Sequence, residues 1–200
     1  MSATELVLLR HGESLWNAEH RYQGQQGTGL SARGRQQAKQ AADYLQSFEF
    51  DGIVASDLQR VTETLQPYLD SRDHLEVRVD KRWREIDVGT WGGRMIADIA
   101  AEEPHVVEAF ARGEDVARGG GETFRQLRAR VWDAAQDITR SGVRRVLVVT
   151  HGGPIRVAAA SALGLPAGDE MLLDPPGNCS LTTLRLDGLT SYNVPTGMDR

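Results

Sequence analysis

Glu5-Leu6-Val7-Leu8-Leu9-Arg10 and Val146-Leu147-Val148-Val149-Thr150 are the two stretches of sequence that decide the fold. In both, the apolar residues are continuous and do not alternate with polar ones. Continuous apolar runs of this length are typical of parallel strands that are covered on both faces. They predict two inner strands, over residues 5–10 and 143–150.

Further strands and helices alternate with these two. Apolar residues recur at helical spacing in four segments, residues 31–47, 58–69, 122–141 and 153–163. Ser31 suits the N-cap of the first of these helices. Additional strands are predicted at residues 52–56, 75–79 and 180–186, of which 75–79 alternates apolar and polar residues like a strand near an edge. The pattern predicts an α/β fold, a three-layer sandwich with a mainly parallel central sheet flanked by helices.

One segment, residues 87–121, interrupts the alternation with glycines and mixed charges. It contains one predicted helix, over residues 96–111, which Pro104 breaks. The run Arg118-Gly119-Gly120-Gly121 suits a return hinge. We interpret residues 87–121 as a small lid inserted over one end of the sheet in a single domain of residues 1–200.

Composition and charge exclude several classes of protein. The 200 residues carry 23 Lys and Arg against 28 Asp and Glu, so the formal net charge is −5. This balance argues against a general binder of nucleic acid or of anionic membranes, and no apolar run approaches the ~20 residues of a membrane span. The N-terminus has no basic region of a secretory signal, and the single Cys179 cannot form an internal disulfide. We therefore expect a cytoplasmic protein.

Charged and titratable side chains follow four of the predicted strands. Ligands of open α/β sheets bind beyond the carboxyl ends of the strands, so these side chains should meet at one edge. Taken alone, each has an ordinary surface role; Glu85, for instance, could pair with Arg82 or Arg84. Together, the two His and two Arg would repel one another unless an anion lies between them. The residues concerned are Arg10, His11, Arg60, Glu85 and His151.

Phosphoryl transfer is the chemistry that such a group of side chains suggests. Arg10 and Arg60 each offer a planar fork of N–H donors to phosphate oxygens. A neutral imidazole can attack phosphorus and form a phosphohistidine, and nearby guanidinium groups lower the pKa of the imidazole. Glu85 could protonate the leaving oxygen and then activate water.

Five blocks of sequence resemble the histidine phosphatase superfamily, also called the phosphoglycerate mutase-like family. They occur in the family's order along nearly the whole chain, which makes the resemblance specific. The blocks are Leu9-Arg10-His11-Gly12-Glu13 with Asn17; Arg21-Tyr22-Gln23-Gly24 with Leu30-Ser31 and Gly34; Ser56-Asp57-Leu58-Gln59-Arg60 with Thr64; Arg84-Glu85 with Gly89, Trp91 and Gly93; and Thr150-His151-Gly152-Gly153 with Ile155-Arg156.

The resemblance implies roles for these residues. His11 would accept the phosphoryl group and Glu85 would donate the proton. The residues that would bind the substrate are Arg10, Asn17, Gln23, Gly24, Arg60, His151 and Gly152. The family's reaction needs neither metal nor cofactor, and His20, His74 and His105 show no ligand spacing. Two glycines, Gly27 and Gly29, stand where the family commonly has Asp and Pro, so the loop 24–29 should be more flexible than usual.

Two reactions remain open, hydrolysis and mutase-type transfer. Phosphoglycerate mutases of this family carry polar substrate-binding groups at positions that correspond to Ile86, Val88 and Ile96 of this chain. Their lid is also longer. A smaller lid admits water, so we favour a phosphatase of small-metabolite phosphomonoesters over a mutase. A phosphate-binding protein without turnover is disfavoured because His11 and Glu85 are both present. A dinucleotide-binding protein is disfavoured because no G-x-G-x-x-G motif follows the first strand.

The identity of the substrate remains open at the level of sequence. The expected partner is a small phosphorylated metabolite, and a homodimer is left open. Arg94 or Arg118 of the lid could contact a second anionic group of the substrate, although a solvated surface position suits either of them equally well.

Overall fold

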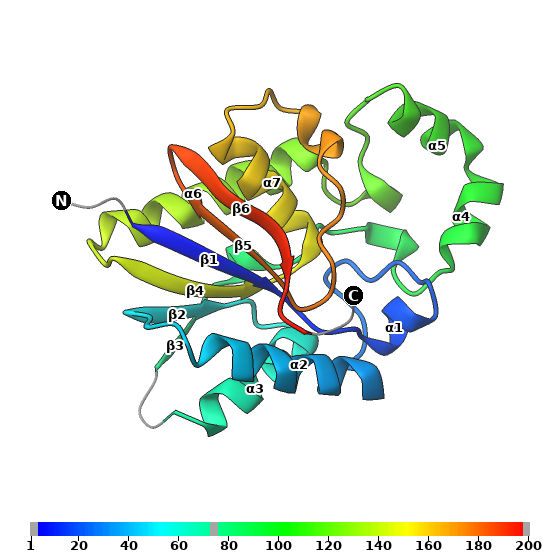
Figure 1. Cartoon of the computed structure of the whole chain (residues 1–200). Coiled ribbons are helices and arrows are strands. Elements are labelled where there is room, and N and C mark those ends of the chain that lie inside the picture. Colours follow the sequence, from blue (N-terminus) through cyan, green and yellow to red (C-terminus); the bar gives the residue numbers. More distant parts are fainter. Residues whose placement is uncertain (1–3, 73–75, 198–200) are drawn as a thin grey trace.

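A six-stranded mixed sheet forms the centre of the computed structural model, which describes residues 4–72 and 76–197 (Figure 1). Its strand order is β3-β2-β4-β1-β5-β6. The first four of these strands run parallel, and β5 and β6 are antiparallel to their neighbours. The predicted mainly parallel sheet with flanking helices is therefore confirmed. The strands are β1 (Glu5–Arg10), β2 (Gly52–Ala55), β3 (Val77–Val79), β4 (Arg145–Thr150), β5 (Ser180–Arg185) and β6 (Gly188–Pro195).

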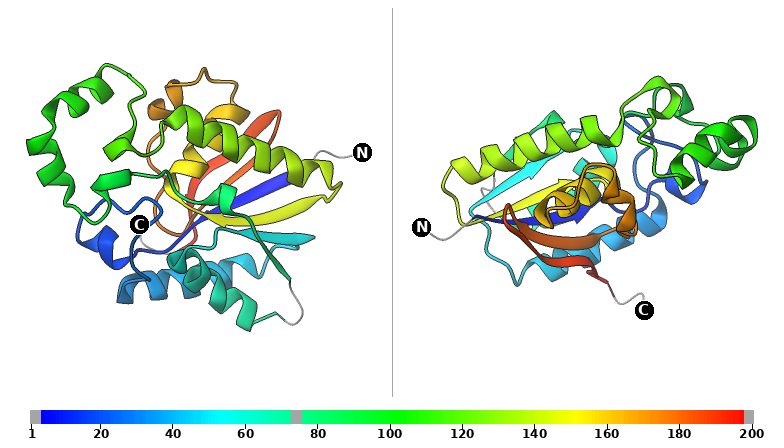
Figure 2. Two further views of the ribbon diagram at one scale, coloured as in Figure 1. Left: turned by 180° about the vertical axis from the view of Figure 1, so that it is seen from behind. Right: turned by 90° about the horizontal axis from the view of Figure 1, so that it is seen from above.

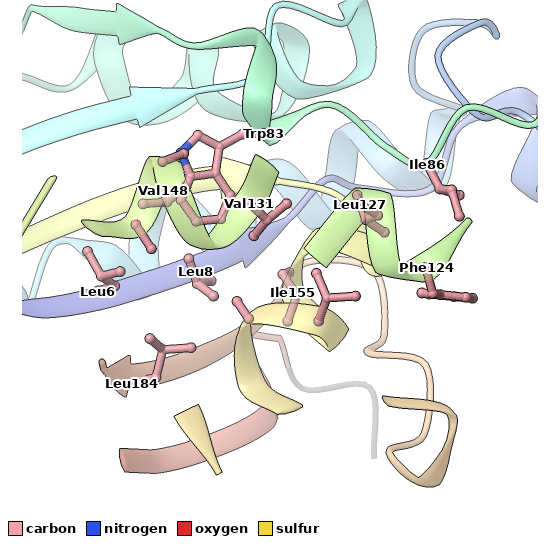
Figure 3. Packing of buried hydrophobic residues seen from close by; sticks show 14 of the residues in the cluster. Leu6, Leu8, Trp83, Ile86, Phe124, Leu127, Val131, Val148, Ile155 and Leu184 are labelled. Atoms are coloured by element: carbon pink, nitrogen blue, oxygen red, sulfur yellow. The ribbon is translucent and has the colours of Figure 1, made fainter. Parts of the chain in front are cut away.

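Helices cover both faces of the sheet and bury its apolar runs. On one face α2 (Ala32–Leu45) and α3 (Gln59–Asp70) pack on Val7, Leu9, Leu147 and Val149. On the other face α6 (Phe124–Arg140) and α7 (Gly152–Ala162) pack on the alternate residues, including Leu6, Leu8 and Val148 (Figure 3). The inner residues of β1 and β4 are apolar on both sides because both faces of the sheet are covered. In the described ranges, no helix is long and apolar enough to cross a membrane.

Side chains cap the N-termini of α2 and α6, and the cap of α2 is the predicted Ser31. The Ser31 side chain accepts the Gly34 N–H at the start of α2. Thr123 and Gln126 form a capping box at the start of α6. Such caps satisfy N–H groups that have no partner within the helix, and they fix where each helix begins.

The lid, residues 87–121, projects beyond the end of the sheet to which β1 points (Figures 1 and 2). Its predicted helix consists of α4 (Ile96–Glu102) and α5 (Pro104–Ala111), which meet at Pro104. The two ends of the lid come together at Gly89 and Gly119, where a Cβ on Gly89 would lie 2.1 Å from the Gly119 carbonyl oxygen. Glycine at this crossing lets the two backbones touch, which returns the chain to α6.

Of the two edge strands of the sheet, the sequence predicted only one. β3 is an edge strand, as predicted, although Leu75 of the predicted strand lies outside the described residues. At the other edge β6 was not predicted. It pairs antiparallel with β5 through a tight turn at Leu186 and Asp187. Its half-exposed, mixed polar sequence carries no clear period, so the pattern gave no signal.

Candidate active site

The five residues expected at the strand ends lie together in the structure. Arg10 and His11 follow β1, Arg60 begins α3, Glu85 follows a 3₁₀ turn (Lys81–Trp83) after β3, and His151 follows β4. We call these five residues the strand-end cluster. Four of them, all except His151, line a cavity of about 160 Å³ between the sheet and the lid.

His11 is held by hydrogen bonds at both ring nitrogens. Its Nδ1 lies 2.7 Å from the Gly12 carbonyl oxygen, which can only accept, so Nδ1 carries the proton. The other nitrogen, Nε2, accepts the Arg60 Nε–H at 3.2 Å. The imidazole is therefore neutral, with the lone pair of Nε2 directed toward Arg60.

Burial keeps both histidines of the cluster neutral. It lowers the pKa of His11 well below the ordinary value, and the positive charges of Arg60 and Arg10 lower the pKa further. The sequence argument named only the arginines, which are the smaller cause. The same causes lower the pKa of His151, whose ring lies 5.1 Å from that of His11. His151 Nε2 lies 2.9 Å from Ser56 Oγ, and its Nδ1 is buried with no hydrogen-bond partner in the described structure.

Arg60 is buried, with an exposed fraction of 2%, which excludes a solvated surface role for it, and Arg10 is partly buried. Burial lowers the pKa of Arg60 to about 10. Its Nη1 and Nη2 donate to the carbonyl oxygens of Gln26 and Gly24, at 2.8 and 2.7 Å. The 24–29 loop, expected to be flexible, is thus tied to the cluster. Arg10 donates to the Pro176 carbonyl, and its buried Nε has no partner within the described residues.

Glu85 faces the N-terminus of α7 and pairs with neither Arg82 nor Arg84. Those arginines bind Asp80 and Asp57. The carboxylate of Glu85 accepts the Gly153 N–H, with distances of 3.1 and 3.3 Å to its two oxygens. A Cβ on Gly153 would lie only 2.2 Å from Glu85 Oε1, so glycine is required there for the carboxylate to reach this position.

The predicted substrate-binding residues surround the same cavity with two differences. Asn17, Gln23 and Gly24 line it. The oxygen of Asn17 accepts the Ser14 N–H, and that of Gln23 accepts the Ser14 hydroxyl, which leaves both amide NH₂ groups as donors for an anion. His151 and Gly152 are set back from the wall. A Cβ on Gly152 would lie 3.6 Å from Arg10 Nε.

The lid side of the cavity is mainly apolar. Ile86 and Val88 form part of its wall, whereas Ile96 is exposed at the start of α4 and is absent from the lining. The two lid arginines differ. Arg94 binds Glu102 on the surface at 2.5 Å, while Arg118 is 9% exposed and lines the cavity. Arg118, and not Arg94, is therefore placed to meet a substrate.

Sequence reasoning missed several residues that build the site. Arg21 and Tyr22 line the cavity, and Ser56 contacts His151. Arg130 of α6 donates to the backbone carbonyls of Arg82, Arg84 and Glu85 and so fixes the turn that carries the acid. Arg21, Tyr22 and Ser56 belong to the quoted sequence blocks, but Arg130 gave no signal, because an arginine on the polar side of a helix is ordinary.

The remaining histidines and the cysteine lie elsewhere. His20 and His105 are exposed, and His74 falls outside the described residues. Across residues 4–72 and 76–197, no three His, Cys, Asp or Glu side chains are grouped so as to hold a metal ion. Burial raises the pKa of the Cys179 thiol to about 12, and the Cys179 N–H donates to the carbonyls of Arg10 and His11. Cys179 thus braces the histidine turn through its backbone.

A mixed α/β sheet with arginines and histidines at the ends of its strands is typical of one class of enzyme, which transfers phosphoryl groups through a histidine. The chain belongs to that class, the histidine phosphatase superfamily (branch 1), whose model matches residues 6–192.

Known relatives include enzymes named for both reactions. The chain is 37% identical over 193 residues to the glucosyl-3-phosphoglycerate phosphatase of Mycobacterium tuberculosis, covering 92% of this chain and 86% of the relative. It is 35% identical over 182 residues to a probable phosphoglycerate mutase GpmB of Enterobacter sp., covering 90% and 84%. A solved structure of the mycobacterial phosphatase with VO3 superimposes with a TM-score of 0.87 at 34% identity, covering 96% of this chain and all of that one.

Proposed function

We propose that this protein is a phosphatase that hydrolyses phosphomonoesters of small metabolites through a covalent phosphohistidine. The observation that carries the proposal is the state of His11, a buried neutral imidazole in the wall of a cavity lined by arginines, whose unprotonated Nε2 accepts the Arg60 Nε–H. A nucleophile in this state needs no base to deprotonate it.

The first step transfers the phosphoryl group to the enzyme. His11 Nε2 forms a bond to phosphorus while the bond from phosphorus to the ester oxygen breaks. Glu85 donates its proton to the leaving oxygen, which departs as an alcohol. Arg10 and Arg60 hold the phosphoryl oxygens and neutralise the charge that develops on them, with hydrogen bonds added by His151, Asn17 and Gln23 and by the backbone at Gly24 and Gly152.

The second step returns the enzyme to its starting state. Glu85, now ionised, accepts a proton from water, and the oxygen of that water attacks phosphorus. The bond to Nε2 breaks, so that inorganic phosphate and neutral His11 are formed. The carboxylate stays in place for both steps because the Gly153 N–H and the Arg130 contacts to the backbone hold it.

Three further proposals concern partner, cofactor and location. We propose a small phosphorylated metabolite as the substrate, because the cavity of about 160 Å³ is smaller than the 300–1,000 Å³ typical of pockets that bury whole drug-sized ligands. We propose that the reaction needs no metal. We also propose a cytoplasmic location, which the single buried Cys179 supports.

Mutase-type transfer is the second candidate, favoured by the relatives named phosphoglycerate mutase. A mutase must retain its substrate while the phosphoryl group moves between two hydroxyl groups. Ile86 and Val88 give this cavity apolar groups on the lid side, and they offer no hydrogen bonds to a second hydroxyl. This observation favours hydrolysis.

One assay separates the two candidates. The protein, with a chelator present, is incubated with a panel of phosphorylated metabolites that includes 3-phosphoglycerate, glycerol 3-phosphate and glucosyl-3-phosphoglycerate, and both phosphate release and isomerisation are followed. We expect phosphate release together with an acid-labile phosphoenzyme. Isomerisation faster than phosphate release would establish the mutase, and loss of activity with the chelator would refute the metal-independent mechanism.

A further inference from the structure

Ser56 is a buried serine directly after β2, and its hydroxyl contacts a ring of the strand-end cluster. Its Oγ lies 2.9 Å from His151 Nε2, and both residues have an exposed fraction of 0%. The backbone places them side by side, because β2 pairs parallel with β4 and the Ser56 N–H donates to the Val149 carbonyl. Bulk water does not reach this contact, so either the serine or the histidine supplies its proton.

The second contact of the Ser56 hydroxyl decides the direction of the hydrogen bond. The Leu58 N–H donates to Ser56 Oγ over 3.4 Å, and a backbone N–H cannot accept. Within residues 4–72 and 76–197, His151 Nε2 is the one acceptor that the hydroxyl proton of Ser56 meets. If His151 donated instead, this buried hydroxyl proton would have no partner, which is costly. Ser56 therefore donates, and His151 Nε2 carries a lone pair.

The proton of the His151 ring then lies on Nδ1. Burial, and after it the charge of Arg60, lowers the pKa of His151, so the ring is neutral and has a single N–H donor. Nδ1 is buried without a hydrogen-bond partner in the described structure, as is Arg10 Nε. The ring centre of His151 lies 5.1 Å from that of His11, so an oxygen on a phosphorus bound to His11 is within reach of this donor.

We infer that Ser56 is a positioning residue that holds His151 in the tautomer with its proton on Nδ1, so that the ring donates to the phosphoryl group. The hydrogen bond made at one nitrogen of an imidazole sets which nitrogen is protonated. In the opposite tautomer Nδ1 would carry a lone pair, and this lone pair would repel the phosphoryl oxygens. The inference rests on the proposed function and adds to it a residue that acts through His151 and does not touch the substrate.

NMR of the whole protein measures the tautomer directly. In histidine with isotope-labelled ring nitrogens, a nitrogen that carries a proton and one that carries a lone pair have well-separated shifts, and His151→Gln identifies the signals. The wild type should show the proton on Nδ1. Ser56→Ala removes the hydroxyl, so both nitrogens can carry the proton and their shifts should move toward each other. Ser56→Thr keeps the hydroxyl and should keep the wild-type shifts.

Binding of inorganic phosphate measures what the tautomer contributes to the site. The calorimetric Kd of phosphate should rise about three- to ten-fold in Ser56→Ala, the effect of one weakened hydrogen bond, and should stay near the wild-type value in Ser56→Thr. Ser180→Ala is the matched control. Ser180 is also a buried serine at the end of a strand, but its hydroxyl has no hydrogen-bond partner in the described part of the chain, so phosphate binding should not change.

A wild-type spectrum with the proton on Nε2 would overturn the inference, and this measurement stands even if Ser56→Ala does not fold. Unchanged His151 shifts in a folded Ser56→Ala protein would overturn it as well, because Ser56 would then only fill space. So would wild-type affinity for phosphate in a Ser56→Ala protein whose tautomer has changed. The proposed function fails separately, if the wild type releases no phosphate from an aryl phosphate.

Discussion

The strand-end cluster and the lid approach the same cavity from opposite sides, and they are held in different ways. His11 and His151 follow strands of the central sheet, Arg60 begins the covering helix α3, and their positions are fixed by neighbours such as Gly12, Ser56 and Gly24. The lid touches the cavity through Val88 at its base, next to Ile86, and through Arg118 between two aromatic rings.

The comparison indicates a division of labour. The cluster side carries all the groups that the transfer itself needs, namely nucleophile, acid and phosphate donors. The lid side supplies shape and one further cation. Substitutions in the strand-end cluster should therefore lower the turnover rate for every substrate, whereas substitutions in the lid should change which substrates are preferred.

The largest effect is expected on replacing the nucleophile. His11→Ala removes the atom that bonds to phosphorus, so turnover of every substrate should fall by roughly 10⁴- to 10⁶-fold, the scale seen when a covalent nucleophile is lost. Steady-state phosphate release and trapping of the phosphoenzyme measure this. The lid control is Val107→Ala, at an exposed position on α5, which should retain wild-type rates. A phosphoenzyme that persisted in His11→Ala would show that another residue is the nucleophile.

A smaller effect is expected where the acid meets α7. Gly153→Ala introduces a Cβ that must displace the Glu85 carboxylate. Since a general acid contributes about 10²- to 10⁴-fold, kcat for alkyl phosphates should fall about 10- to 100-fold. Aryl phosphates should be affected less, because their leaving groups need less protonation. Gly52→Ala, where a Cβ meets nothing within 4 Å, is the control; equal losses for alkyl and aryl phosphates would contradict the role of Glu85.

The smallest effect concerns stability and pH. The pKa values of His11 and His151 are lowered in the folded protein, so below about pH 6.5 the unfolded chain binds protons that the folded one does not. Stability is retained above that pH and falls as the pH drops, by about 1.4 kcal/mol per pH unit for each histidine. Urea unfolding between pH 6.5 and 5 measures the slope. His11→Gln should reduce it, and an unchanged slope would mean that His11 is protonated in the folded protein.

Most of the cluster side could be predicted from sequence, because continuous apolar runs mark the inner strands and polar residues directly follow them. Arg10, His11 and His151 were placed in this way. The side chains of the lid could not be predicted in the same detail, because the sequence pattern of α4 and α5 does not indicate which arginine points into the cavity. Arg94 and Arg118 are equivalent as sequence, and only the packing of Phe110 and Phe124 distinguishes them. Arg130 was missed because its partners are backbone carbonyls far away in the chain.

The carbonyl contacts of Arg60 and Arg10 bear on how the product leaves. Arg60 donates to the carbonyl oxygens of Gly24 and Gln26, and Arg10 donates to that of Pro176. A phosphate ion that takes these donors, as we propose, exchanges one set of hydrogen bonds for another, so its net gain in binding free energy is smaller than bare cations would provide. Inorganic phosphate should consequently dissociate readily and inhibit weakly. A protein that stores or carries phosphate would be built in the opposite way, with its donors unoccupied until the ion arrives.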